Sequence, residues 1–391
     1  MKDKRFLAGA LVLALAAATM VWALLPRADK PEKWTPGRGM PLPADKLIVG
    51  VLYLDSVEEP GYTFAHDEAL RATQAALGLD DGQIIRKFNV GPTDPLQADH
   101  AVRDCIAQGA NVIVATSREF MNACERLAAE YPDIVFAYVG GHKYNETNLT
   151  AYFGRIYQAR YMSGIAAGMK TKTGKIGFVA AQGRENSEVT GGVNAFALGV
   201  ESVNPDARIL VRVTHGWYDP AGERQAARRL IDAGCDVIAQ HCDTPNPQRE
   251  AERAGVWGIG YSSDMRIDAP GAVLASVVWH WDAYYRKLFA SLVDGTFSTE
   301  PFFGGLAEGM VDMTPLNPDL AEPGMAEAVA KARIRMRDGG FNVFDGVLRT
   351  NDGREVGAPG KTLDDAEIQR GMDWYHHTVA ELQNRNDGTP P

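Results

Sequence analysis

Aromatic and polar residues occur just after several apolar runs of this sequence, where β-strands are expected to end. Tyr62 lies in the loop after the first run, and Trp217 lies in the loop after a later one. Aromatic rings can hold a flat ring between them, while carboxylates, amides and hydroxyls pair with its polar edge. These side chains predict a binding site for a small, flat molecule. The candidate binding residues are Tyr62, Trp217, Gln240, Asp243, Ser262, Asp264 and Trp279.

The tryptophans have a second interpretation. Taken singly, each of Trp217, Trp279 and Trp281 fits the hydrophobic core equally well. The three indoles together, beside expected strand ends and with Tyr62, favour the walls of a ligand site.

Three consecutive residues, His241, Cys242 and Asp243, carry metal-binding groups. Adjacent strand residues point to opposite faces, and no second ligand pair has metal-site spacing, so we expect no metal ion and no other cofactor. Cys242 has no evident cationic or helix-terminal neighbour that would activate it as a nucleophile. Asp219 precedes Pro220, which is typical of a helix N-cap followed by proline at the first helical position.

Enzyme signatures are missing from the sequence. We find no GxxxxGK followed by Ser or Thr, no GxGxxG after the first strand and no GxSxG. Nucleotide hydrolysis, dinucleotide binding and an esterase site therefore lose their usual support. A nucleoside hydrolase stays a weaker alternative, because it would need clustered carboxylates or metal ligands, which this chain shows only as scattered strand-end residues. The chain has 40 basic and 50 acidic residues, a net charge of −10, which disfavours nucleic-acid binding. Its 391 residues, 45% of them hydrophobic, predict a folded protein with an ample core.

Apolar runs alternate with helical segments twice along the chain, a pattern typical of parallel βαβ units. The first set has expected strands at 47–53, 84–88, 111–116 and 134–139, with helices at 64–77, 95–108 and 118–131. After a helix at 156–172, the second set has strands at 175–181, 208–214, 236–241 and 256–261, with helices at 189–203, 220–233 and 246–254. This pattern predicts an α/β fold of two doubly wound parallel-sheet lobes joined by a hinge. Ligands of such sheets bind beyond the carboxyl ends of the strands, so we expect the site between the lobes.

The remaining segments continue the chain between and beyond the lobes. We expect a strand at 272–276, a helix at 279–294, a strand at 309–313, a helix at 324–338, a glycine-rich meander at 339–360 and a helix at 363–382. We assign residues 45–155 to lobe 1, 156–272 to lobe 2, 273–310 to a return to lobe 1, and 311–391 to a C-terminal segment that completes the lobes.

The N-terminal residues predict export from the cytoplasm. Lys2, Lys4 and Arg5 precede twenty uncharged residues, 6–25, which is typical of a signal peptide or of an uncleaved anchor. Residues 26–44 are expected to form a tether. We expect a periplasmic protein, membrane-anchored if the signal is not cleaved. The first cysteine is Cys105, so lipid attachment at a cleavage-site cysteine is not expected.

Four cysteines are too few for a disulfide scaffold in a chain of this length. Cys235 and Cys242 bracket one expected strand and would lie about 20 Å apart, which is too far for a disulfide. Cys105 and Cys124 lie in successive helices, where the sequence leaves a bridge open.

Several segments resemble those of one protein family. They are GYTFAHD at 61–67, YFGRIY at 152–157, GVNAFALG at 192–199, WYDP at 217–220, DVIAQH at 236–241, GYSSDM at 260–265 and VWHW at 278–281. Together they resemble the basic-membrane-protein (BMP) family of substrate-binding proteins for ABC importers, a branch of the type I periplasmic-binding-protein fold. The resemblance implies two lobes that close around a ligand, usually a purine nucleoside or related purine, delivery to a membrane permease, and no catalysis.

Departures from the family pattern bear on the ligand. The nucleoside-binding branch has an aromatic-Asn pair where this chain has Ala65 and His66, and it has an Asp and a Lys where this chain has Ser262 and Trp279. The loss of these ribose partners and the added indole favour a free base such as adenine, guanine or hypoxanthine over a nucleoside.

The expected mode of binding uses every candidate residue. Tyr62 and Trp217 stack on the two faces of the purine, and Trp279 closes one edge. The residues expected to pair with its polar atoms are Gln240, Asp243, Ser262 and Asp264. We expect a monomer, and two alternatives stay open: a periplasmic ligand sensor, and a binder of another small solute such as a sugar or an amino acid.

Overall fold

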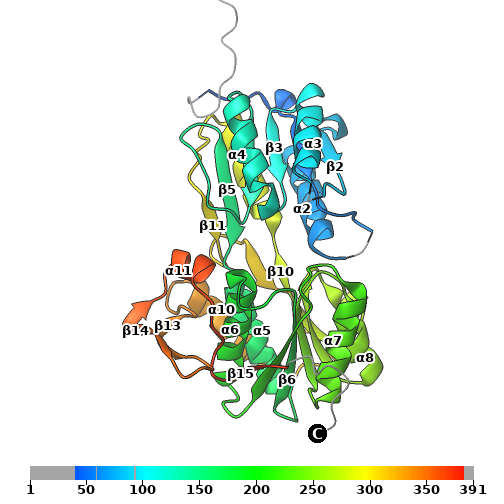
Figure 1. The fold of residues 1–391 in the computed structure, drawn as a ribbon, viewed down its shortest axis with the longest axis vertical. Helices are drawn as coiled ribbons and strands as arrows, with labels where there is room; N and C mark the ends of the chain where they lie inside the picture. The colour runs from blue at the N-terminus through cyan, green and yellow to red at the C-terminus, as the bar shows by residue number, and fades with distance from the viewer. Residues whose placement is uncertain (1–39, 59, 92–93, 383–391) are drawn as a thin grey trace, which may run out of the picture. The chain divides into compact units, whose positions relative to one another are not determined.

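The computed structural model describes residues 40–58, 60–91 and 94–382. All of them belong to one unit of the chain, residues 36–391. The predicted signal peptide, residues 1–25, and most of the predicted tether lie outside the described residues. The described part has two large β-sheets packed with helices, which we call lobe 1 and lobe 2, and a small hairpin (Figure 1).

Lobe 1 has a sheet of six parallel strands in the order β11-β5-β4-β3-β1-β2. All residues of β1, β3 and β4 are buried, because helices cover both faces of the sheet. The strands are β1 (Val49–Leu52), β2 (Ile84–Lys87), β3 (Val112–Ala115), β4 (Val135–Val139), β5 (Leu149–Gly154) and β11 (Phe302–Gly304). The helices are α2 (Tyr62–Leu77), α3 (Pro95–Ala107), α4 (Met121–Glu130) and α9 (Trp281–Val293), with 3-10 turns η1 (Ala44–Lys46), η2 (Asp81–Gln83) and η3 (Arg118–Phe120).

Lobe 2 has a sheet of seven strands in the order β12-β10-β9-β8-β6-β7-β15, in which only the pairing of β10 with β12 is antiparallel. The strands are β6 (Lys175–Ala180), β7 (Arg208–Val213), β8 (Val237–His241), β9 (Trp257–Ser262), β10 (Val273–Trp279), β12 (Val311–Met313) and β15 (Val379–Glu381). The helices are α5 (Ile156–Lys170), α6 (Ser187–Glu201), α7 (Pro220–Asp232), α8 (Asn246–Ala254) and α10 (Met325–Arg337), with the 3-10 turn η4 (Met265–Ile267).

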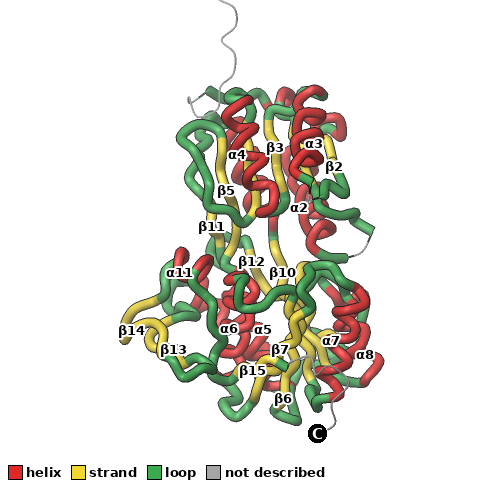
Figure 2. The backbone as a smooth tube through the Cα atoms, in the orientation of Figure 1, coloured by secondary structure: helices red, strands yellow, loops and turns green. Residues whose placement is uncertain are grey.

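The chain crosses between the sheets three times: from β5 into α5, from β10 into α9, and from β11 to β12 (Figure 2). The crossings pack tightly at Gly154. A Cβ atom at this position would lie 2.9 Å from the Trp279 ring and 3.0 Å from both the Gly304 carbonyl oxygen and the Met310 side chain. Only glycine fits there without a shift of its neighbours.

Helices α5 and α6 of lobe 2 touch through two glycines. A Cβ on Gly164 would lie 2.1 Å from the Phe196 carbonyl oxygen, and a Cβ on Gly199 would lie 2.1 Å from the Tyr161 carbonyl oxygen. The two backbones can approach this closely because neither glycine has a side chain.

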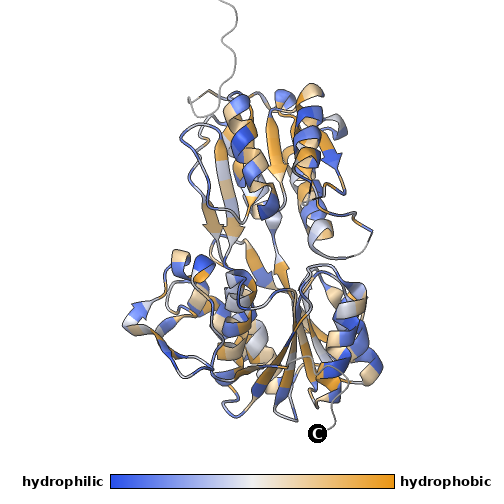
Figure 3. Cartoon of the chain, viewed as in Figure 1, coloured by the Kyte–Doolittle hydropathy of each residue, from blue (hydrophilic) through white to orange (hydrophobic). Residues whose placement is uncertain are grey.

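The cysteines contribute to the two hydrophobic cores, whose strands are the most apolar parts of the fold (Figure 3). Cys105 and Cys124 lie in the core of lobe 1, and Cys235 and Cys242 in the core of lobe 2. All four are free thiols. Burial raises the pKa of Cys105 to about 11 and that of Cys124 to about 12, so these thiols are unreactive.

The predicted order of strands and helices is confirmed from β1 to β4 and from α5 to α9, and β12 and α10 also lie where they were predicted. Helix α8 begins and ends as predicted, and Asp219 caps α7 by accepting a hydrogen bond from the Gly222 N–H at 3.0 Å. The predicted helix at 279–294 begins later, at Trp281, because β10 continues to Trp279.

The predicted helix at 363–382 is wrong. Only α11 (Asp365–Arg370) is helical, and the segment after Gly371 leads into the edge strand β15. The side chain of Asn194 donates to the Trp374 carbonyl oxygen and accepts from the His376 N–H, both at 2.8 Å. These contacts with α6 hold the segment extended and override its local helical pattern.

Three strands of the two large sheets were not predicted: β5 and β11 in lobe 1 and β15 in lobe 2. The glycine-rich residues 339–360 form part of the antiparallel hairpin β13 (Asp345–Arg349) and β14 (Glu355–Thr362). Both strands of this hairpin are largely exposed, so the sequence carries little hydrophobic alternation that would have marked them.

Candidate functional site

A cavity of about 220 Å³ lies between the two lobes, where loops at the carboxyl ends of their parallel strands meet. Lobe 1 lines it with Leu54, Asp55, Tyr62, Ser117, Arg118, Glu119, Val139, Gly140, Phe153, Gly154 and Phe303. Lobe 2 lines it with Ile156, Tyr157, Asn186, Ser187, Glu188, Trp217, Asp243 and Tyr261, and the C-terminal helix α11 adds Ile368 and Gln369.

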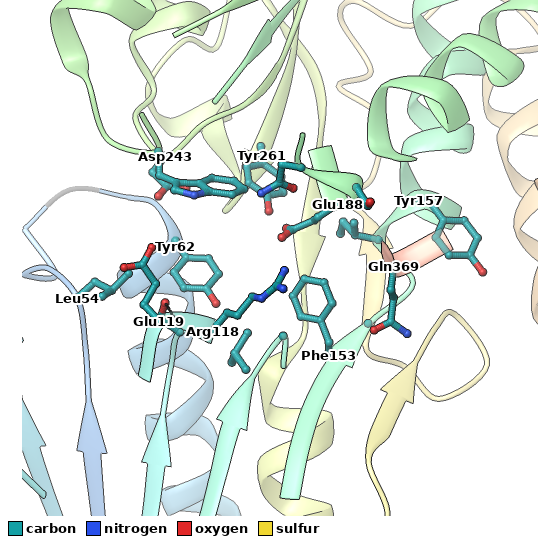
Figure 4. Close-up of a pocket in the computed structure, with 18 of the residues that line it drawn as sticks. Leu54, Tyr62, Arg118, Glu119, Phe153, Tyr157, Glu188, Asp243, Tyr261 and Gln369 are labelled. Carbon is teal, nitrogen blue, oxygen red and sulfur yellow. Dashed lines mark hydrogen bonds between the residues drawn. The ribbon is translucent and has the colours of Figure 1, made fainter. Parts of the chain in front are cut away.

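Aromatic side chains from both lobes form much of the wall. Tyr62 and Phe153 come from lobe 1, and Trp217 and Tyr261 come from lobe 2. Figure 4 shows Tyr62 and Phe153 on the side of the cavity opposite Tyr261. A flat ligand can therefore contact rings from both lobes at once.

Tyr62 is held in place by a second set of rings behind it. Its ring packs edge-on against His66, with the centroids 4.6 Å apart, and against Trp281, at 5.9 Å. His66 in turn stacks on Trp281 at 4.0 Å. Because His66 and Trp281 are fully buried, the orientation of Tyr62 is fixed before any ligand binds.

Asp243 offers an unused hydrogen-bonding atom. Its Oδ1 is buried without a partner among the described residues. Its main-chain N–H donates to the Trp217 carbonyl oxygen at 2.9 Å, which ties the two loops together. Burial raises the pKa of Asp243 well above its usual value, and the nearby charges of Glu223, Asp55 and Glu188 raise it further.

Glu188 lies in the first turn of α6, which Asn186 caps by accepting from the Val189 N–H at 3.1 Å. Burial raises the pKa of Glu188 to about 7, although the charges of Arg160 and Arg118 act in the opposite direction. Its Oε1 lies 3.4 Å from Nε2 of His241, whose pKa is lowered by burial and by Arg160. His241 is therefore neutral near pH 7.

Arg118 begins η3, just after β3, and Figure 4 shows its side chain extending into the cavity toward the side that carries Glu188. Among the described residues that line the cavity, it is the only lysine or arginine. The acidic lining residues are four, namely Asp55, Glu119, Glu188 and Asp243. Carboxyl oxygens accept hydrogen bonds, so this lining favours ligands that donate them.

Three of the seven sequence-selected residues line the cavity: Tyr62, Trp217 and Asp243. Gln240 and Asp264 do not, because local partners occupy their side chains. Gln240 donates to the carbonyl oxygens of Cys242 and Thr244, at 2.9 and 2.8 Å. Asp264 caps η4 and pairs with the Arg266 side chain, with Nε and Oδ1 2.8 Å apart.

Trp279 and Ser262 also do not line the cavity; both lie next to Tyr261, which does. The Trp279 Nε1–H donates to the Tyr261 hydroxyl at 3.0 Å, and its ring stacks on Trp281 with the centroids 4.5 Å apart. Ser262 follows Tyr261 in β9 and is buried. Trp279 thus positions the Tyr261 phenol from behind.

Comparison with known proteins identifies the family. Residues 47–336 match the family model Bmp, described as ABC transporter substrate-binding protein PnrA-like. The chain belongs to this family. The resemblance found in the sequence and the predicted two-lobed α/β fold are both confirmed.

Two relatives are more than 30% identical to this chain, and a solved structure shares its fold. A purine-binding protein of Brucella abortus is 32% identical over 333 residues, 85% of this chain and 92% of the relative. A putative ABC transporter glucose-binding protein of Haloferax volcanii is 35% identical over 285 residues, 73% of this chain and 71% of the relative. A solute-binding protein of Conexibacter woesei has the same fold, with a TM-score of 0.63 at 20% identity, covering 76% of this chain and 98% of that one.

Bmp-family proteins are the substrate-binding components of ABC transporters, and such binding proteins are generally not enzymes. In importers, such proteins act outside the cytoplasm and deliver their ligand to a membrane permease. Within the described ranges of this Bmp protein, none of the helices has the length and apolar character needed to cross a membrane.

The sequence analysis missed several cavity residues, although signals in the sequence could have identified some of them. Arg118 follows the predicted strand end at Thr116, so the strand-end criterion would have selected it. Tyr261 lies within a segment that carried the family resemblance. Glu188 was missed because α6 begins before the predicted start at 189, and Gln369 gave no signal because the predicted C-terminal helix was wrong.

One group of possible metal ligands occurs among the described residues. Glu201, His376 and His377 place ligand atoms within 4.8 Å of one another, and His377 Nε2 lies 2.8 Å from Glu201 Oε1. Glu201 ends α6, whereas Glu188 is in its first turn. Thirteen residues of helix separate these two positions by about 20 Å, so the group lies away from the cavity.

Proposed function

We propose that this Bmp protein captures a purine, a free base in preference to a nucleoside, between its lobes and presents it to an ABC permease. One observation carries the proposal: Tyr62 and Trp217 extend into one cavity from opposite lobes, beside the partnerless Oδ1 of Asp243. Stacking supplies affinity for the ring, and the carboxyl group recognises its polar edge. The purine-binding relative in Brucella abortus supports this choice of ligand.

The polar partners in the proposal line the cavity. Asp243 keeps the role that the sequence analysis gave it, and Glu188 and Arg118 replace Gln240, Ser262 and Asp264. The carboxyl groups meet ring N–H groups, and the guanidinium meets ring nitrogen or carbonyl acceptors. A buried polar group left without a partner costs about 1–3 kcal/mol, which is enough to discriminate among bases.

The preference for a base rests on the residues that replace the ribose partners. Neither Ser262 nor Trp279 lines the cavity, and neither carries the charge that the resemblance places at its position. The acidic lining makes a nucleotide the poorest purine ligand, because a phosphate would face four carboxyl groups and a single guanidinium.

A sugar is the second candidate. The Haloferax volcanii relative is named as a putative glucose-binding protein, and carboxyl groups such as Asp243 and Glu188 also accept hydrogen bonds from sugar hydroxyls. The two ligand classes differ in shape, since only a purine presents two extended flat faces to Tyr62 and Trp217.

The test is isothermal titration calorimetry of the purified protein with adenine, guanine, hypoxanthine, adenosine, inosine, AMP and glucose. We expect the free bases to bind most tightly and AMP most weakly. Trp217→Ala should weaken base binding about 10- to 100-fold, because the stacking surface is lost. Tyr218→Ala is the matched control, since its ring is 52% exposed and does not line the cavity.

Two results would contradict the proposal. Binding of glucose without any purine would establish the sugar alternative, and purine binding unaffected by Trp217→Ala would remove the stacking mode. Free base released from inosine or adenosine during a long incubation would instead indicate a nucleoside hydrolase.

A further inference from the structure

The cavity has a wall that the family match does not include. The Bmp match ends at residue 336, at the end of α10, while the described chain continues through the hairpin β13–β14, α11 and β15. Two residues of this C-terminal segment, Ile368 and Gln369, line the cavity. Residues 337–382 therefore contribute directly to the site.

The C-terminal segment is anchored firmly on lobe 2. Strand β15 extends the second sheet by pairing with β7, with Val379 opposite Ile209. Asn194 of α6 bonds the main chain at Trp374 and His376, and Trp374 is buried. Helix α11 is thus joined to lobe 2 by backbone pairing and by buried contacts.

A second anchor joins α11 to the crossing between the lobes. Arg155 lies between β5 and α5, and its Nη2 and Nε bind the two carboxylate oxygens of Asp365 at 2.6 and 3.2 Å. The same guanidinium donates to the Phe303 carbonyl oxygen at 2.6 Å. This bidentate pair fixes the position of α11 next to the crossing between β5 and α5.

Gln369 has an amide that the described residues leave without a hydrogen-bond partner, although the side chain is partly buried. Its neighbour Ile368 is 6% exposed and supplies apolar contact. Figure 4 places Gln369 on the side of the cavity where Tyr157 lies, away from Tyr62 and Asp243. An amide both donates and accepts, so it matches a ligand edge that carries both kinds of group.

We infer that α11 completes the ligand cavity and that Gln369 is a specificity-determining residue, whose amide pairs with the polar edge of the bound purine. The inference rests on the proposed function. It assigns a binding role to a segment beyond the family match, and it makes the Arg155–Asp365 pair a positioning element for the site.

The test compares Gln369→Ala with Arg370→Ala, an exposed residue of the same helix. We expect Gln369→Ala to weaken adenine or hypoxanthine binding about 3- to 10-fold in calorimetry, the effect of one neutral hydrogen bond. The melting temperature of the ligand-free protein should not change, because Gln369 has no partner to lose. Arg370→Ala should alter neither quantity.

The outcomes separate this inference from the proposed function. If the wild-type protein binds no purine, the proposed function fails. If the wild type binds purine and Gln369→Ala binds equally well, only the role of Gln369 is overturned.

A second variant, Asp365→Asn, tests the positioning role without touching the cavity lining. We expect faster amide hydrogen exchange in residues 364–371 together with weaker purine binding. Faster exchange with unchanged affinity would overturn the claim that α11 is part of the site.

Discussion

Two of the aromatic rings that line the cavity are supported by neighbours that do not line it. His66 and Trp281 orient Tyr62, and Trp279 bonds the Tyr261 hydroxyl. Ligand binding then costs little conformational entropy in these side chains, since their rotamers are already restricted. The exceptions are the groups left without partners, such as Asp243 Oδ1, which the ligand is expected to satisfy.

Glu188 makes the stability of the protein depend on pH. Its pKa is about 7 in the folded chain and near 4.5 in the unfolded chain. Between these values the folded state keeps a proton that the unfolded state has lost, so the Glu188 contribution to stability falls as pH rises from about 4.5 to about 7. Arg160 and Arg118 oppose this shift, and burial lowers the pKa of the neighbouring His241 well below its usual value.

The variant Glu188→Gln removes this dependence. We expect its free energy of unfolding, relative to that of the wild type, to rise between pH 4.5 and 7 and to level off above. Urea unfolding at pH 4.5, 5.5, 6.5 and 7.5 measures the difference. Glu119→Gln, at an exposed carboxyl of the same cavity, controls for the loss of one charge. A difference that stays constant across the series would refute the assignment.

Among the elements, helix α6, packed against α5, positions two parts of the site. Helix α6 carries Glu188 at its start and Asn194 in its middle, so its placement sets both a cavity carboxyl and the anchor of the C-terminal segment. That placement depends on backbone contact with α5 at Gly164 and Gly199.

Gly199→Ala should destabilise the fold. The added Cβ would lie 2.1 Å from the Tyr161 carbonyl oxygen, which is backbone and cannot move aside as a side chain can. We expect a loss of about 1–3 kcal/mol in the free energy of unfolding, even after the helix propensity gained by alanine. Denaturant unfolding measures it, and Gly82→Ala, where nothing lies within 4 Å of the new Cβ, is the control. Equal stability of the two variants would contradict the close-contact argument.

At the scale of the whole molecule, the two lobes meet beside the cavity. A Cβ on Gly61 of lobe 1 would lie 2.4 Å from the Asp243 carbonyl oxygen of lobe 2. Gly61 has φ of 178°, an extended conformation that alanine also adopts, so the substitution strains nothing within lobe 1. A substitution at Gly61 therefore tests how closely the two lobes must approach each other.

Gly61→Ala should hold the lobes apart. We expect purine binding to weaken more than tenfold, and ligand-induced compaction measured by small-angle X-ray scattering to decrease, with little change in melting temperature. Glu58→Ala, an exposed position in the same loop, serves as the control. Normal affinity and compaction in the Gly61→Ala variant would show that this contact does not limit closure.

Local patterns in the sequence determined the order of strands and helices from β1 to β4 and from α5 to α9, the cap at Asp219, the family, and three cavity residues, Tyr62, Trp217 and Asp243. These features depend on side-chain periodicity, on turn residues and on the rule that strand ends gather at one edge of a sheet. All of them are short-range properties that a stretch of sequence carries by itself.

Only the tertiary structure decided which strand-end residues face the ligand. The Asp264 carboxylate pairs with Arg266, and the Gln240 amide donates to a carbonyl oxygen of its own loop. Tyr261, in contrast, reaches the cavity because Trp279 supports its hydroxyl group. The position of Gln369 depends on Arg155, whose partner Asp365 lies 210 residues away in sequence. Contacts between distant residues leave no periodic trace in either segment, so the packing of the lobes, and not the local pattern, completed the site.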